Sequence, residues 1–117
     1  MIARLEQIAD PAERLATLFR QALKGTLDGK VLAALAAADP SPVVTRALER
    51  VAAERVAFVA RCYAELGHPA DEARDRATVA YAAYLGVVTL RRHAGKVVPA
   101  AERDGFIATL VAMMLSR

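Results

Sequence analysis

The longest uncharged stretch of the sequence, ATVAYAAYLGVVTL, runs from Ala77 to Leu90 and is bordered by charged residues at both ends. As an α-helix it makes about four turns. On a helical wheel, one side of this helix gathers Ala77, Ala80, Tyr81, Tyr84, Val87 and Val88. The opposite side gathers Thr78, Ala82, Leu85, Gly86 and Thr89. A helix without a charged side must be covered on both faces, which a small bundle cannot readily do with its own helices.

The last predicted helix has the same property, because Phe106 to Leu115 (FIATLVAMML) contains no charged residue. Two such helices in succession favour a second copy of the chain, paired across a twofold axis into a four-helix interface. Ala82 and Gly86 lie one turn apart, and close backbone approach would explain a glycine that costs roughly 1 kcal/mol in a helix interior. The alternative is a monomer whose own helices cover these small residues. The expected interface residues are Thr78, Ala82, Leu85, Gly86, Thr89, Phe106, Leu110 and Met113.

Composition and length predict one all-α domain spanning residues 1–117. Hydrophobic residues make up 56% of the chain and aromatic residues only 5%, so the filling is Ala, Leu and Val, which suits close helix–helix packing. Alternating strand patterns bounded by turn dipeptides are missing. We therefore expect a helical bundle of five to six helices.

Helix boundaries are marked by capping residues, prolines and glycines. Asp10, Pro11 and Glu13 predict an N-cap, a first helical position and a third position, and Gly25 is expected to end that helix. Gly67 is expected to end a later, long helix. The further helices are predicted at Leu27–Ala38, Pro42–Leu66, Pro69–Arg92 and Pro99–Ser116.

The charge pattern and the cysteine count limit the classes of protein. Sixteen basic and thirteen acidic residues give a net charge of +3, and the signs alternate without a basic run, which indicates a solvated helical surface rather than a nucleic-acid site. A single cysteine, Cys62, excludes an internal disulfide. The chain has no signal-peptide pattern, and its longest uncharged stretch is shorter than the ~20 residues that cross a bilayer. We expect a soluble, cytoplasmic protein without a membrane contact.

No motif of a catalytic or metal site is present, so an enzyme, a metal ion and a cofactor are not predicted. His68 and His93 both lie at helix ends without neighbouring ligand residues, which indicates capping or solvated roles. Cys62 falls on the apolar stripe of the long helix and is interpreted as a small buried hydrophobe rather than a reactive thiol.

Arg55 falls between Val51 and Phe58 on that same stripe, where an unpaired charge would be costly. Three roles are open: an ion pair with Asp39, Asp71 or Asp75, a side chain that extends to solvent, or a cation in a ligand pocket. Aromatic residues on the inward faces of three helices could line such a pocket or form ordinary core. The candidate pocket residues are Leu18, Phe19, Leu32, Leu35, Arg55, Phe58, Cys62, Tyr81 and Tyr84. The Met113–Met114 pair fits either core or interface.

The run ALERVAAERVAFVARCYAELGHPADEARDRATVAYAAYLGVVTLRR, Ala47 to Arg92, resembles the C-terminal regulatory domain of TetR-type (tetracycline-repressor-like) bacterial transcription factors. The resemblance rests on a long helix ending in AELG, followed by PADEAR and by YAAYLG leading to a double Arg. DPAERL at Asp10 to Leu15 resembles the start of the first complete helix of that domain.

The resemblance implies a helical domain that dimerises through its last two long helices, here residues 69–117. It also implies an internal pocket for a small, usually hydrophobic, effector that shifts the dimer and so releases two DNA-binding heads from their operator. The helix-turn-helix head is not in this chain, and residues 1–9 are expected to be the remnant of the helix that connects to it. The expected function is ligand sensing and homodimerisation, with DNA contacted only through the missing head. The alternative is a headless interaction protein that forms mixed dimers with full-length regulators.

Overall fold

The computed structural model describes residues 2–27, 42–97 and 99–116, and these residues are helical or loop, with no strand. The all-α prediction is therefore confirmed. Within these described ranges, four helices have thirteen or more residues. A short helix precedes the first of them and a 3₁₀ turn precedes the last. Their bounds are α1 Ile2–Leu5, α2 Pro11–Leu27, α4 Pro42–Glu65, α5 Ala70–His93, η1 Ala100–Glu102 and α6 Arg103–Leu115. Of the helix predicted at Leu27–Ala38, only Leu27 lies within the described residues. The expected number of five to six helices therefore stays a prediction.

Most helix boundaries lie close to those that the capping residues, prolines and glycines predict, with two exceptions. The helix predicted from Pro99 begins as the 3₁₀ turn Ala100–Glu102 and becomes α-helical at Arg103. Helices α4 and α5 begin and end within one residue of their predicted bounds. Helix α2 was expected to stop at Gly25, but it continues to Leu27, so that prediction is wrong. A glycine in a last turn lowers helix propensity by roughly 1 kcal/mol, which is too little to end a helix by itself.

The start of α2 is capped as its sequence predicts. The Asp10 carboxylate accepts a hydrogen bond from the Ala12 backbone N–H at 3.1 Å, and the Asp10 carbonyl accepts one from the Arg14 N–H at 2.9 Å. Pro11 takes the first helical position, where its missing N–H leaves no hydrogen bond unmade. The Glu13 side chain pairs with Arg20.

Helix α4 ends in a turn that requires a glycine. Gly67 has φ +105°, and its N–H donates to the Ala64 carbonyl at 3.0 Å. The His68 N–H donates to the Tyr63 carbonyl at 3.2 Å, and the His68 ring meets the Tyr63 ring edge-on at 5.7 Å between centroids. These two bonds and this contact are the elements of a Schellman cap, which fixes how the chain leaves α4 and enters α5.

Replacing Gly67 with alanine is expected to lower the free energy of unfolding by about 1–2 kcal/mol, because an L-residue with a Cβ is strained at this φ. A Cβ at this position would meet no atom within 4 Å, so the loss reflects the backbone and not a clash. Urea unfolding measures the difference. Gly67→Asn, which tolerates the left-handed region better, should lose less than the alanine variant. Equal stability of the alanine variant and the parent would contradict this account.

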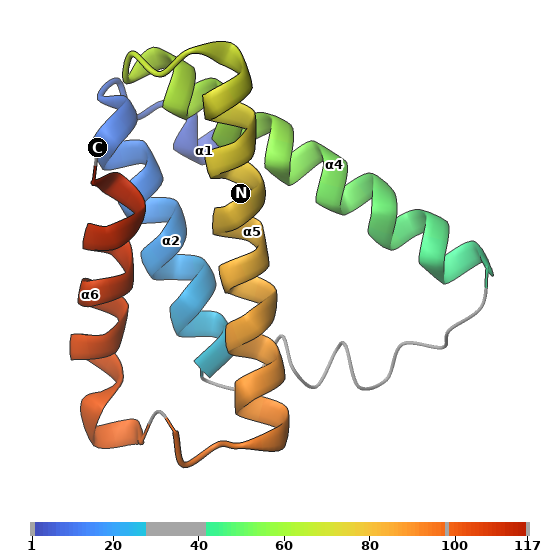
Figure 1. Cartoon of the computed structure of the whole chain (residues 1–117), viewed down its shortest axis with the longest axis vertical. Coiled ribbons are helices and arrows are strands. Elements are labelled where there is room, and N and C mark those ends of the chain that lie inside the picture. Colours follow the sequence, from blue (N-terminus) through green and yellow to red (C-terminus); the bar gives the residue numbers. More distant parts are fainter. Residues whose placement is uncertain (1, 28–41, 98, 117) are drawn as a thin grey trace.

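Helices α2, α5 and α6 run side by side, while α4 packs against α5 near its C-terminal end and extends away from them toward its N-terminus (Figure 1). The shared core takes residues from all four long helices, with the Leu15 side chain fully buried at its centre. Leu5 of α1 is also buried in this core, so the N-terminal segment is part of the packed body. No helix among the described residues is both long and apolar enough to span a bilayer.

Candidate functional site

The two sides of α5 separate as the helical wheel predicts. Ala77, Ala80, Val87 and Val88 are buried, and Tyr81 and Tyr84 on the same side are half-buried. All five residues of the opposite side are exposed: Thr78, Ala82, Leu85, Gly86 and Thr89. The apolar stretch of α5 therefore has one face in the core and a second face that no described part of the chain covers.

This second face, together with the neighbouring Val79 and Leu90, is called the α5 face below. Val79 is 58% exposed and Leu85 is 43% exposed. The face carries no charged residue from Thr78 to Leu90, a length of about 18 Å along a helix. Its residues Thr78, Ala82, Leu85 and Thr89 follow one another at spacings of four, three and four, the repeat of a helix that packs along a partner helix.

The polar groups of the α5 face are satisfied within the helix. The Thr78 hydroxyl donates to the Arg74 carbonyl at 3.0 Å, and the Thr89 hydroxyl donates to the Leu85 carbonyl at 3.0 Å. Threonine side chains bonded back to their own helix need no further partner. A Cβ placed on Gly86 would meet no atom within 4 Å, so the chain's own packing gives no steric reason for a glycine there. The α5 face therefore consists of small and apolar residues whose hydroxyl groups need no hydrogen-bond partner outside the helix.

Helix α6 exposes a similar stripe, which includes one of the three expected interface residues of this helix. Met113 is 61% exposed, whereas Phe106 and Leu110 are half-buried and pack against the core. Between Asp104 and Ser116 the exposed side of the helix is uncharged. The residues of this α6 stripe are Gly105, Ala108, Thr109, Ala112 and Met113. Met114 is half-buried against the core, so the two methionines of the pair have different environments.

The candidate pocket residues are only partly brought together. Phe19, Phe58 and Cys62 are buried in one core cluster, and Leu18 packs against it. Tyr81 and Tyr84 are half-buried and pair with each other, with ring centroids 5.9 Å apart. Leu32 and Leu35 lie outside the described residues.

Arg55 is exposed, which fits one of its three possible roles, a side chain that extends to solvent. Val51 is exposed as well, whereas the stripe packs in or against the core from Val56 onward. Of the three possible ion-pair partners, Asp39 lies outside the described residues, and no pair joins Arg55 to Asp71 or Asp75. The arginine beside the Phe58 ring is Arg61, whose guanidinium carbon lies 5.7 Å from the ring centroid.

Cys62 is buried, as expected, with 1% of its surface exposed. Burial raises the pKa of its thiol, and the guanidinium of Arg14, 3.7 Å from the sulfur, opposes that rise. The His68 Nδ1 lies 3.7 Å from a Glu72 carboxylate oxygen, and the His68 side chain is 13% exposed, so it is mostly packed rather than solvated at the start of α5. The His93 side chain lies outside the described set. Among the described residues, no three His, Cys, Asp or Glu side chains form a group that could hold a metal ion.

Sequence reasoning missed two polar side chains that join distant parts of the chain. Arg14 of α2 pairs with Glu65 of α4, and Tyr63 of α4 donates its hydroxyl hydrogen to the Met114 carbonyl of α6 at 2.6 Å. The pKa of Arg14 is raised by its hydrogen bonds to Cys62 and Glu65. Burial raises the pKa of Tyr63, so its hydroxyl remains a hydrogen-bond donor at neutral pH. The position of Tyr63 next to Cys62 was the available signal, because it falls on the same buried side of α4.

Comparison of the chain with protein-family models, with curated proteins and with solved structures gives no match.

Proposed function

We propose that this chain is a homodimerisation and ligand-sensing domain of the kind that its sequence resembles, the regulatory domain of TetR-type regulators. The observation that carries the proposal is the exposed, uncharged α5 face. Helix α6 carries a second exposed, uncharged stripe. Exposed large apolar residues grouped on one surface favour a contact with another protein.

A second copy of the chain is the partner that this surface fits. The α5 face has no charge to attract an oppositely charged partner, and its alternating spacing of threes and fours is self-complementary across a twofold axis. In the proposed dimer Ala82 and Gly86 lie at the closest approach, because they allow two helix backbones to meet. Leu85, Val79 and Met113 then supply the apolar area that association removes from water.

The ligand in this proposal is a small hydrophobic effector bound among Phe19, Phe58 and Cys62. These residues come from α2 and α4, and they belong to one cluster of buried hydrophobic side chains. Such an effector changes the dimer only if it binds two arrangements of the helices with different affinity. Helix α5 links the two roles, since one of its faces lies in the core and the other in the proposed interface.

Gly86→Ala tests the proposed interface. In the isolated chain this change is expected to raise the free energy of unfolding by up to about 1 kcal/mol, because alanine is the better helix former and the added Cβ has open space. In the dimer the same Cβ separates the helices, so the dissociation constant should rise at least about tenfold. Urea unfolding at high dilution measures the first effect, and a dilution series by light scattering measures the second.

Ala82→Gly is the matched reverse variant on the same face. It should lower the unfolding free energy of the isolated chain by roughly 1 kcal/mol, yet leave room for close approach. A Gly86→Ala protein that is more stable and associates as tightly as the parent would rule out close helix packing at Gly86.

A further inference from the structure

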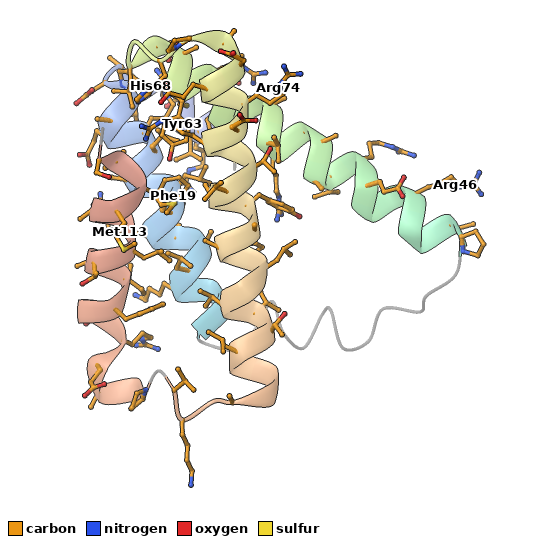
Figure 2. All side chains as sticks on the ribbon, in the orientation of Figure 1. Phe19, Arg46, Tyr63, His68, Arg74 and Met113 are labelled. Atoms are coloured by element: carbon orange, nitrogen blue, oxygen red, sulfur yellow. The ribbon has the colours of Figure 1, made fainter. Side chains whose placement is uncertain are left out.

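Hydrogen bonds from both ends of the chain meet on one turn of α4, residues 62–65. Figure 2 labels Tyr63 and His68 of this region, and they lie at the end of the molecule where α4 turns into α5 and where α6 ends (Figure 2). Cys62 and Tyr63 are each 1% exposed. The side of the turn that carries these two residues is therefore packed against its neighbours, while Ala64 and Glu65 are exposed.

Arg14 connects this turn to the N-terminal segment. Its Nε donates to the Ile8 carbonyl at 3.0 Å, and one terminal nitrogen lies 3.4 Å from the Ala9 carbonyl. The other terminal nitrogen contacts both the Cys62 sulfur and the Glu65 carboxylate. One planar guanidinium thus bonds two carbonyls of the α1–α2 loop and two side chains of α4, and its fixed geometry leaves little freedom between them.

Tyr63 connects the same turn to the C-terminal end of α6. Its hydroxyl donates to the Met114 carbonyl at 2.6 Å, and Arg76 of α5 donates to the Ser116 carbonyl at 2.8 Å. Carbonyls in the last turn of a helix have no partner within the helix, so these donors satisfy groups that would otherwise be unpaired. Met113, which belongs to the exposed α6 stripe, adjoins Met114 in this turn.

We infer that the last turn of α4 is a conformational junction, which couples the order of the N-terminal segment to that of the C-terminal turn of α6. Tyr63 and Cys62 are consecutive residues, so a displacement of this turn moves the Arg14 and the Tyr63 contacts together. This inference goes beyond the proposed function and does not depend on it, because every contact lies within one chain. Its consequence is that a conformational change in residues 2–9 is transmitted to the α6 stripe through the last turn of α4.

Hydrogen–deuterium exchange of the full chain tests the junction with two variants. Tyr63→Phe removes only the hydroxyl that bonds Met114, and should speed exchange of the amides at the C-terminal end of α6 about tenfold. The junction requires that exchange in residues 4–14 also rises, by at least about threefold. Glu65→Gln, which removes the charge facing Arg14, should produce the same two effects with the larger one in the N-terminal segment.

The control is Tyr81→Phe, which removes a hydroxyl from a half-buried tyrosine of α5 whose ring contacts Tyr84. It should leave exchange at both ends of the chain unchanged. The amides of residues 77–88 in α5 are the internal reference, since simple destabilisation would raise their exchange equally. The junction is overturned if each variant affects only its own segment, or if exchange rises uniformly along the chain.

Discussion

Ala82→Glu is expected to weaken self-association at least about 100-fold, because a twofold interface would receive two carboxylates at its closest approach. Ala82 is exposed in the isolated chain, so its replacement should change the unfolding free energy of the monomer by no more than about 0.5 kcal/mol. This combination of a large effect on association and a small effect on folding identifies a contact surface. Sedimentation velocity over a concentration series measures the first quantity, and urea unfolding at high dilution measures the second.

The matched control is Ala57→Glu, which adds the same charge at an exposed alanine of α4 that is not part of the α5 face. Its self-association should equal that of the parent. If Ala82→Glu and Ala57→Glu associate alike, the α5 face is not the contact surface, whatever the mass of the parent protein.

Leu15→Ala is expected to lower the free energy of unfolding by about 3–5 kcal/mol, the upper part of the range for a leucine truncated in a core. Leu15 is 0% exposed and lies in the cluster that takes residues from α2, α4, α5 and α6. A leucine that is fully buried leaves a cavity when it is truncated, because the surrounding core collapses into that space only in part. Urea unfolding monitored by circular dichroism gives the difference.

Leu15→Met is the control for this variant, because methionine has nearly the same volume as leucine. It should lose less than about 1.5 kcal/mol. A loss below about 1 kcal/mol for Leu15→Ala would contradict a core centred on this residue.

The secondary structure was readable from the sequence because the signals are local. Asp10 and Pro11 begin α2 through backbone groups within four residues, and Gly67 ends α4 through a single positive φ. The prediction that α2 ends at Gly25 was wrong, because a glycine ends a helix only when the residues after it take a different backbone conformation. Here the residues after Gly25 remain helical to Leu27.

The two faces of α5 were also readable, because its buried and exposed sides differ in every turn. Helical periodicity could not decide among the three roles of Arg55. A three- and four-residue spacing says which residues share a side of a helix, but not where along the helix that side stops being covered. Helix α4 extends away from the other helices, so Val51 and Arg55 share a side with Phe58 without sharing its environment (Figure 1).

Residues Phe106 to Leu115 of α6 contain no charged side chain, so the sequence did not indicate which side of this helix faces solvent. Phe106 and Leu110 therefore stood as candidates for the same surface as Met113, although they pack against the core. Arg14 and Tyr63 were beyond reach because their partners, Glu65 and the Met114 carbonyl, lie 51 residues away in each case. Such contacts depend on how helices are arranged in space, which a single sequence does not encode locally.

The mass of the unmodified chain in solution tests the central claim most directly. One chain has a mass of 12.5 kDa, so sedimentation equilibrium at micromolar concentration should give twice that value if the uncharged faces of α5 and α6 pair between two copies. A mass of 12.5 kDa that stays constant as the concentration rises would contradict the account, since the α5 face would then remain in water.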